Sequence, residues 1–329
     1  MAKPAALIAS AAALALVQPG PVAATPAAPE TAITAPGPQG ALAGTILRAA
    51  KPKAPVALII PGSGPTDRNG NNPLGVAAAT YRLLAEGLAA QGITTVRIDK
   101  RGMFGSGGAV PDANAVNIPD YVTDTAAWME AIRKATGAPC VWLIGHSEGG
   151  LVALAAAQQS KDLCGVVLVA APGRPLGEVL KSQLRANPAN AALIAPAEAA
   201  IDQLAAGGRV DANSLPAPLR PLFTPALQGF LASAFPLDPA RLAGQVRAPL
   251  MIVQGGKDLQ VPLADAERLK AANPSARLLV LPDANHVMKN VASNNPADNL
   301  AAYRAADLPL ADGVVAGIAA FIAEPKVSR

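Results

Sequence analysis

Short apolar runs alternate with helix-patterned stretches along most of this 329-residue chain, and this alternation limits its fold more than any other feature. Apolar runs bounded by glycine or proline are typical of buried strands, whereas apolar residues three and four apart are typical of helices. Strands that alternate with helices predict a mostly parallel sheet with helices on both faces. The predicted strands are residues 41–48, 55–60, 93–98, 141–144, 166–170, 249–254 and 278–281, and the predicted helices are residues 76–90, 121–132, 151–159, 264–271 and 314–323.

One long segment interrupts the alternation. Residues 174–244 contain helical pieces separated by prolines and no convincing strand pattern. Phe223 and Phe230 lie here on a stripe with helical spacing. We interpret the segment as a small helical lid inserted into a core made of residues 41–173 and 245–329. The two phenylalanines favour an apolar pocket beside the lid, and the same stripe is equally typical of a core within the lid.

The first residues have the pattern of an export signal. Lys3 gives a positive start, residues 5–17 form an apolar run, and residues 22–24 fit a small-residue cleavage site. The run is shorter than the roughly 20 residues that span a bilayer. We predict a signal peptide at residues 1–24, a linker rich in proline and alanine at residues 25–40, and a periplasmic or secreted protein. No cysteine lies near this segment, so we expect no lipid anchor.

The charge balance argues against a nucleic-acid partner. The chain has 27 Lys and Arg against 23 Asp and Glu, and the basic residues are scattered rather than clustered. Removal of residues 1–24 takes away only Lys3, so the net charge becomes 26 − 23 = +3. A basic patch with interleaved aromatic residues is absent from the sequence, and we expect a small-molecule substrate instead.

The two cysteines stand at the start of successive predicted strands. Cys140 precedes the strand at residues 141–144, and Cys164 precedes the strand at residues 166–170. Neighbouring parallel strands begin about 5 Å apart, which is within disulfide reach. Export favours a disulfide over two buried free thiols, which are the alternative. Without a Cys-x-x-Cys motif, and with two histidines in the chain, we expect no metal site and no cofactor.

Gly-His-Ser-Glu-Gly at residues 145–149 lies where a buried strand ends and a helix begins. Glycines at both flanks allow a sharp turn that exposes the serine hydroxyl at the carboxyl end of the sheet, which is the arrangement called a nucleophile elbow. Ser147 is therefore the predicted nucleophile. An ordinary turn is the alternative, and the strand and helix on either side of the motif argue against it.

A serine hydroxyl needs a base, and histidine is suited to that role near neutral pH. The chain offers His146 and His286. Adjacent residues on a tight turn point their side chains apart, so we expect His146 to pack beneath the elbow. His286 follows the strand at residues 278–281 and faces the same edge of the sheet as Ser147. It is the predicted base.

The imidazole also needs a carboxylate that fixes its tautomer. Asp258 lies in Gly-Gly-Lys-Asp-Leu-Gln-Val-Pro, directly after the strand at residues 249–254. Asp283 is closer to His286 along the chain, but it lies in the same loop and is better placed to cap that turn. We favour Asp258 over Asp283.

Two backbone amides are expected to stabilise the oxyanion that forms on the substrate. One belongs to Glu148, at the start of a helix, and the other belongs to Ser63, in the loop after the strand at residues 55–60. In the same loop we expect Asp67 and Arg68 to pair, and a contact between Arg68 and an acidic substrate group is the alternative.

A second glycine-rich run, at residues 101–108, includes Phe104. It lacks the Gly-Lys-Ser/Thr sequence and the Gly-x-Gly-x-x-Gly spacing of phosphate-binding loops. We therefore interpret it as a turn that lines the rim of the substrate pocket.

These motifs resemble those of the α/β-hydrolase superfamily from the first strand to the last helix. The segments that carry the resemblance are GHSEGG at 145–150, GGKDLQVP at 255–262, ANHVMK at 284–289 and IDKRGMFGSGG at 98–108, the last with one residue of altered spacing. PGSGPTDRNGNNP at 61–73 and APGRPLGEVLKSQL at 171–184 are similar to bacterial, often exported carboxylesterases related to prolyl-aminopeptidase-like hydrolases. Pro61 and Gly62 replace the His-Gly pair that often precedes the oxyanion donor.

The residues and the resemblance together predict an exported serine esterase for small or medium-chain carboxylic esters. A peptidase or amidase of the prolyl-aminopeptidase type is the first alternative, and it requires an acidic lid residue such as Glu178, Glu198 or Asp202 to bind a free amine. A thioesterase is disfavoured because acyl-CoA is cytoplasmic. A non-catalytic binding protein is disfavoured because all three triad residues are present.

Overall fold

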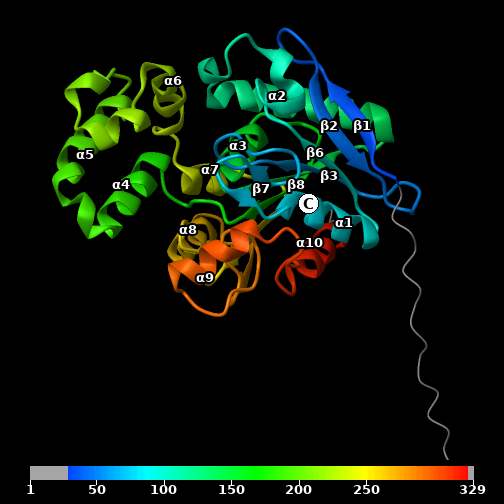
Figure 1. Cartoon of the computed structure of the whole chain (residues 1–329). Helices are drawn as coiled ribbons and strands as arrows, with labels where there is room; N and C mark the ends of the chain where they lie inside the picture. The colour runs from blue at the N-terminus through cyan, green and yellow to red at the C-terminus, as the bar shows by residue number, and fades with distance from the viewer. Residues whose placement is uncertain (1–28, 325–329) are drawn as a thin grey trace, which may run out of the picture.

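The structure is a computed structural model that describes residues 29–324, so the predicted signal peptide lies outside the described residues. Within that range eight strands form one sheet, in the order β1-β2-β6-β3-β7-β8-β9-β10 (Figure 1). The strands are β1 (Thr31–Ala35), β2 (Leu42–Leu47), β3 (Val56–Ile60), β6 (Thr94–Ile98), β7 (Val141–His146), β8 (Leu163–Val169), β9 (Leu250–Gly255) and β10 (Arg277–Leu281).

Most neighbouring strands of the sheet run parallel. Strands β3, β6, β7, β8, β9 and β10 pair in parallel, while β2 is antiparallel to both β1 and β6. The loops that follow the parallel strands therefore meet at one edge of the sheet. Strand β1 lies in the segment predicted as a linker, so that prediction is wrong for residues 31–35. Ala35 is the one buried residue of this strand, which suits its place at the edge of the sheet.

The two faces of the sheet are covered by different helices. On the central strands, alternate residues such as Leu143 and Leu168 pack with α2, α3, α7 and α8, whereas Ile144 and Val169 pack with α1 and α10. This division follows from the two-residue period of a strand. Outside the lid the helices are α1 (Thr80–Ala90), α2 (Ile118–Thr136), α3 (Glu148–Ala157), α8 (Leu263–Ala272), α9 (Pro296–Ala301) and α10 (Val314–Ala323).

Helix α1 begins later than predicted. The prediction placed its start at residue 76, but the structure forms a two-stranded hairpin, β4 (Asn71–Asn72) and β5 (Val76–Ala77), before the helix. The backbone then passes through the left-handed region at Ala79, with φ of 53°, and this conformation interrupts a helix. Short 3-10 helices lie at Phe104–Ala109, Ala113–Ala115, Pro188–Asn190, Ala212–Ser214, Ala217–Leu222 and Ala302–Arg304.

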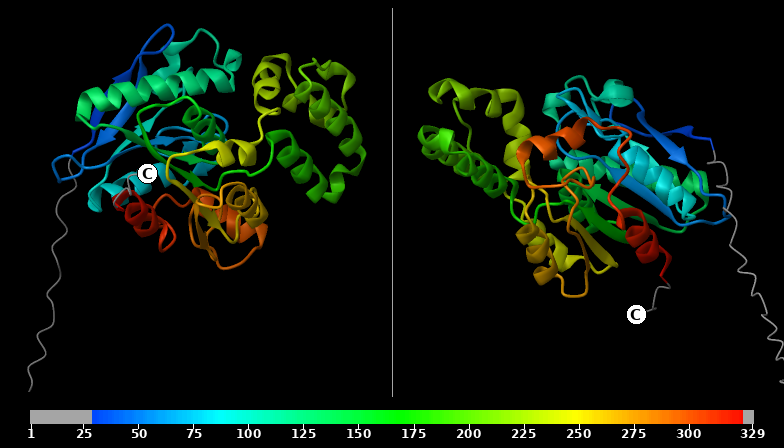
Figure 2. Two further views of the ribbon diagram at one scale, coloured as in Figure 1. Left: turned by 180° about the vertical axis from the view of Figure 1, so that it is seen from behind. Right: turned by 60° about the horizontal axis from the view of Figure 1, so that its bottom comes forward.

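The connection between β8 and β9 contains helices and no strand, and its α4, α5 and α6 form a lobe beside the sheet in Figures 1 and 2, whereas α7 packs with the main core. It contains α4 (Leu176–Ala186), α5 (Ala191–Ala205), α6 (Pro225–Ala234) and α7 (Pro239–Gln245). The lobe has an apolar cluster of its own, in which Ile201, Leu204 and Phe223 are buried. The predicted fold class, a mostly parallel sheet flanked by helices with a helical insertion between late strands, is confirmed. Among residues 29–324 no helix is both long enough and apolar enough to cross a membrane.

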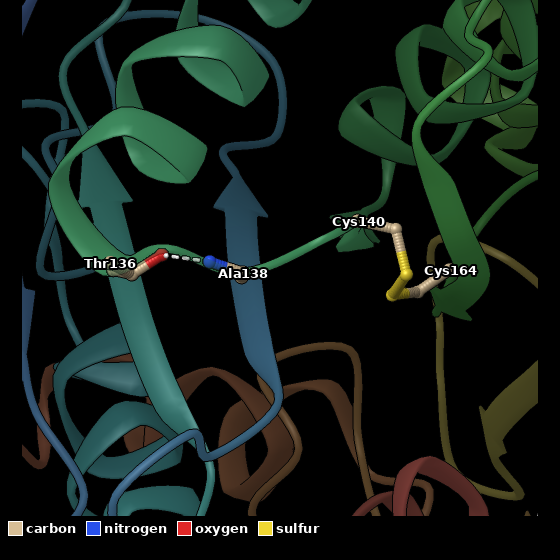
Figure 3. Close-up of a disulfide and its surroundings, with 4 residues drawn as sticks. All are labelled: Thr136, Ala138, Cys140 and Cys164. Atoms are coloured by element: carbon tan, nitrogen blue, oxygen red, sulfur yellow. Dashed lines mark hydrogen bonds between the residues drawn. A yellow bond between two sulfur atoms is a disulfide. The ribbon is translucent and has the colours of Figure 1, made fainter.

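Cys140 and Cys164 form a disulfide at the amino ends of β7 and β8 (Figure 3). Their Cα atoms are 5.2 Å apart, as expected for neighbouring strands that begin side by side. The hydroxyl of Thr136 accepts a hydrogen bond from the amide of Ala138, where the chain leaves α2 for this strand. The disulfide therefore lies at the edge of the sheet opposite the edge that receives the loops after the parallel strands.

Candidate active site

Ser147 occupies a strained turn between β7 and α3. Its φ and ψ are 53° and −122°, a backbone conformation that residues other than glycine avoid unless the surrounding structure enforces it. The turn requires glycine on both sides of Ser147, because other backbone atoms lie where a side chain at residue 145 or 149 would begin. A Cβ atom would lie 2.2 Å from the Gly149 oxygen if placed on Gly145, and 2.3 Å from the Ile60 oxygen if placed on Gly149. The motif thus holds the Ser147 hydroxyl at the carboxyl edge of the sheet.

His286 binds Asp258 at this edge. The Nδ1 atom of His286 lies 2.8 Å from Oδ2 of Asp258, and both side chains are buried. Burial alone would raise the pKa of Asp258. Nearby His286, through charge and hydrogen bonding, and the backbone amides of Val261 and Gln260 outweigh burial and lower it. Asp258 is therefore an ionised acceptor that keeps the proton of His286 on Nδ1, which leaves Nε2 available as a base.

Asp283 has a different partner. Its carboxylate lies 2.7 Å from the ammonium of Lys257 and is largely exposed to solvent. The backbone amides of Gln260 and Val261 donate to Oδ1 of Asp258 at 2.8 and 2.9 Å, so its carboxylate is fixed from both sides. The structure thus brings Asp258, and not Asp283, to the imidazole of His286.

Ser147 and His286 both line one cavity of about 180 Å³. Thr66, Asn72 and Gln260 contribute polar groups to the rest of the wall, and Val76 and Val287 contribute apolar ones. A larger groove of about 950 Å³ lies between α2, α3 and α6, but none of the three triad residues lines it. The smaller cavity is the candidate site because the predicted nucleophile and the predicted base both line it.

His146 serves the architecture of the site. Its Nε2 atom donates to the backbone oxygen of His286 at 2.9 Å, and its Nδ1 accepts from the hydroxyl of Tyr81 at 2.9 Å. Burial, and secondarily the charge of His286, lowers the pKa of His146 to about 3. The ring is therefore neutral near pH 7, and both of its nitrogens are engaged. It packs beneath the elbow, where the sequence placed it.

The two expected oxyanion donors flank Ser147. Across residues 29–324, neither the amide of Ser63 nor that of Glu148 has a hydrogen-bond partner. The Ser63 loop approaches the nucleophile closely, since a Cβ on Gly62 would lie 3.3 Å from the Cβ of Ser147. Glu148 is the first residue of α3, where the helix dipole favours negative charge. Two unpaired amides next to a nucleophile form the arrangement that an oxyanion requires.

Arg68 holds its loop, but not through Asp67. Its guanidinium and its backbone amide both donate to the buried carboxylate of Asp99, at the end of β6. Asp67 instead accepts from the amides of Asn69 and Asn71 at 2.8 Å and closes a turn within the loop. The predicted pair of Asp67 with Arg68 is wrong because sequence adjacency placed together two side chains that the fold sends to different partners.

The four residues expected around the substrate lie away from this cavity. Arg68 is bound to Asp99, and Phe104 is about half exposed at the start of the 3-10 helix Phe104–Ala109. Phe223 is fully buried inside the lid, and Phe230 packs against Tyr121, with ring centroids 6.4 Å apart. Phe223 therefore fills the core of the lid and Phe230 packs against the main core, so neither lines the cavity beside Ser147.

Several residues of the site were not expected from the sequence. Tyr81 and Tyr303 line the cavity, and Gln260 donates to the hydroxyl of Tyr303 at 2.7 Å. Lys100 lies directly below the Ser63 loop. Tyr81 lies in the helix predicted at residues 76–90, but its role in the site depends on His146, which is 65 positions away.

Comparison with known proteins agrees with this geometry. The profile of the alpha/beta hydrolase family matches residues 57–302, which is well over half of the chain. The chain belongs to the alpha/beta hydrolase family. Within the matched range lie all three residues of the Ser147, Asp258 and His286 constellation and both candidate oxyanion donors.

One sequence relative of this alpha/beta hydrolase and several structures with a similar fold are named esterases. Esterase EstD of Thermotoga maritima is 27% identical over 240 residues, which cover 71% of this chain and 54% of the relative, so the chain spans about half the length of that protein. An esterase of Pyrococcus furiosus has a TM-score of 0.52 at 17% identity, over 79% of this chain and 83% of its own. An esterase domain of a Rhodothermus marinus protein has a TM-score of 0.51 at 19% identity, over 90% of this chain and 100% of its own. At these identities the structural likeness supports the fold alone.

Proposed function

We propose that this alpha/beta hydrolase is a serine esterase that cleaves carboxylic esters with a short acyl group through an acyl-enzyme. The observation that carries the proposal is the convergence of Ser147 and the Asp258-bound His286 on one cavity, next to two unpaired amides. Kinship with a protein named an esterase supports the same reaction class.

The geometry implies a two-step reaction. Oγ of Ser147 bonds to the acyl carbon while Nε2 of His286 takes the hydroxyl proton, and the Ser63 and Glu148 amides bind the oxyanion. The imidazolium, stabilised by Asp258, then gives its proton to the departing alkoxide. Water attacks the acyl-enzyme by the same route, with His286 as base, and releases the carboxylic acid and free Ser147.

The cavity favours a short acyl group. Its volume of about 180 Å³ is well below the roughly 300 Å³ at which pockets for drug-sized ligands begin. Val76 and Val287 supply apolar surface for such a group, and Thr66, Asn72 and Gln260 add hydroxyl and amide groups to the wall. We therefore narrow the predicted range of small or medium chains to acyl groups of a few carbons.

The lid argues against an aminopeptidase. The expected amine-binding carboxylates are engaged elsewhere, since Glu178 and Asp202 bind Lys181 and Glu198 binds Arg185. None of these groups lines the cavity that contains Ser147. An ester, which has no free amine to neutralise, fits this site better.

We further propose that the protein is exported and that residues 1–24 are removed. The disulfide between Cys140 and Cys164 supports an oxidising compartment. Mass spectrometry of protein recovered from outside the cytoplasm tests the proposal, which predicts a mature chain beginning near residue 25. An exported chain that still carries Met1 or Ala2 would contradict it.

A substrate panel tests the esterase proposal. We expect turnover of p-nitrophenyl acetate and butyrate, much slower turnover of the decanoate, and no release from proline p-nitroanilide. Ser147→Ala should lower turnover by about 10⁴-fold or more while the circular dichroism spectrum stays unchanged. Anilide cleavage without ester cleavage would replace the proposal with a peptidase, and equal turnover by the variant would remove Ser147 as nucleophile.

A further inference from the structure

Lys100 is a buried cation that the catalytic steps above do not use. It follows β6 in the turn at residues 98–108, and its side chain is only 5% exposed. Its ammonium donates to the backbone oxygen of Gly62 at 2.7 Å and lies 3.7 Å from the carboxylate of Glu148. The ring of Tyr121 lies beneath it, with its centroid 5.4 Å from Nζ.

The contact with Gly62 acts on an oxyanion donor. The oxygen of Gly62 and the amide of Ser63 belong to the same peptide unit, which is planar, so fixing the carbonyl fixes the direction of the N–H on its opposite side. A charged donor makes a short, strong hydrogen bond to that carbonyl. Such a bond also polarises the peptide and strengthens its N–H as a donor.

Lys100 also contacts the residue that supplies the other donor. The carboxylate of Glu148 faces the ammonium, while the amide of Glu148 begins α3 beside Ser147. The amide of Gly62 donates to the hydroxyl of Tyr81 at 2.9 Å, so the Gly62 backbone is held at its N–H as well as at its carbonyl. One ammonium therefore connects the two segments whose amides must face the same oxygen atom.

A purely structural purpose explains this arrangement poorly. Burial is the main reason that the pKa of Lys100 is lowered, with Glu148 acting in the opposite direction, so the fold bears a desolvation cost to keep a cation here. An apolar side chain of the same length would fill the space without that cost. Placement of a donor against the carbonyl of the oxyanion loop gives the cation a specific use.

We propose that Lys100 is a positioning residue of the oxyanion hole, which holds the Gly62–Ser63 peptide and the start of α3 so that both donor amides face the oxygen bound to the Ser147 adduct. This inference rests on the proposed esterase function. It predicts that loss of the ammonium weakens binding of the transition state more than binding of the ester itself.

Lys100→Met, which keeps the length of the side chain and removes the charge, provides the test. With p-nitrophenyl acetate we expect kcat to fall by about 10- to 100-fold and KM to change little. The loss in kcat should not exceed the loss caused by removing one oxyanion donor. Ethylboronic acid forms a tetrahedral adduct with a catalytic serine, and its Ki should rise by the same factor. Lys100→Arg, which keeps a cationic donor, should recover part of the loss.

Arg101→Met is the matched control, because Arg101 is the next buried cation of the same turn but binds Asp120 and Asp124 of α2. We expect it to lower the melting temperature and leave kcat near the wild-type value. If Lys100→Met does not fold, Lys100→Leu replaces it, since leucine also removes both the charge and the N–H donors. Unchanged kcat in a folded variant, or a loss confined to KM, overturns the role of Lys100 alone. A wild-type protein that neither cleaves the acetate nor binds the boronate overturns this inference together with the proposed function.

Discussion

The buried ring of His146 should make this protein less stable in mild acid. The folded structure keeps the ring neutral, with a pKa of about 3 against 6.5 for a free histidine, because burial, and secondarily the charge of His286, lowers the pKa more than the hydrogen bond to the backbone of His286 raises it. Between these two values the unfolded chain binds a proton that the folded chain does not bind. The stability contributed by neutral His146 is therefore complete above about pH 6.5 and is lost as the pH falls below that value.

The size of the effect follows from the span of pH. Each pH unit below 6.5 costs about 1.4 kcal/mol, so the decrease to pH 5.0 removes about 2 kcal/mol from the free energy of unfolding. Asp258 does not contribute over this range. Its pKa is lowered from 3.8, so its stabilisation is complete above about that pH and is lost only in stronger acid.

Urea unfolding at pH 7.5 and pH 5.0 measures the effect, with the disulfide intact in both cases. His146→Gln is the reference, because its amide can still donate to the oxygen of His286 but has no proton to gain. The wild type should lose about 2 kcal/mol more than this variant between the two pH values. Equal losses of unfolding free energy in the two proteins would show that the fold does not keep His146 neutral. The buried hydrogen bonds of His146 with Tyr81 and His286 would then be wrong.

Three further perturbations have clear expected outcomes. His286→Ala should reduce p-nitrophenyl acetate turnover by about 10⁴-fold or more, whereas the His146→Gln variant should remain within about tenfold of wild type; a reversal of that order refutes the choice of base. Gly149→Ala should lower the free energy of unfolding in urea by about 3 kcal/mol or more, because its methyl group would meet backbone atoms. Gly229→Ala, in open space on α6, should raise that free energy by about 1 kcal/mol. Equal effects of the two substitutions would refute the crowding argument. Replacement of both Cys140 and Cys164 by serine should cost about 3.5 kcal/mol, for a bridge across 24 positions, without change in kcat; a large loss of kcat would contradict the separation of the disulfide from the site.

Local pattern was sufficient to predict the main elements and the convergence of Ser147, Asp258 and His286 at one edge of the sheet. Strand and helix periods depend on residues that are close in the chain, and α10 begins and ends as predicted. The carboxyl ends of parallel strands meet at one edge of the sheet. The sequence pattern alone therefore predicts that residues following β7, β9 and β10 lie at one site. Edge strand β1 was missed because its few residues lie among prolines and alanines, where the strand pattern is weak.

The parts of the site that depend on distant packing could not be read in this way. His146 meets Tyr81 and the backbone of His286, 65 and 140 positions away, and no spacing rule connects them. Arg68 chooses Asp99 over its neighbour for the same reason.

The sequence by itself determined the order of strands and helices along the chain, the sharp turn at Ser147 and the loops that present the proposed nucleophile, acid and base. Each of these is encoded by neighbouring residues or by the geometry common to parallel sheets. Only the tertiary structure decided which walls enclose the cavity, why the lid phenylalanines lie outside it, and that Lys100 stands beneath the oxyanion loop. Those outcomes depend on how whole layers pack against one another, and side chains far apart in sequence become partners only when that packing is complete.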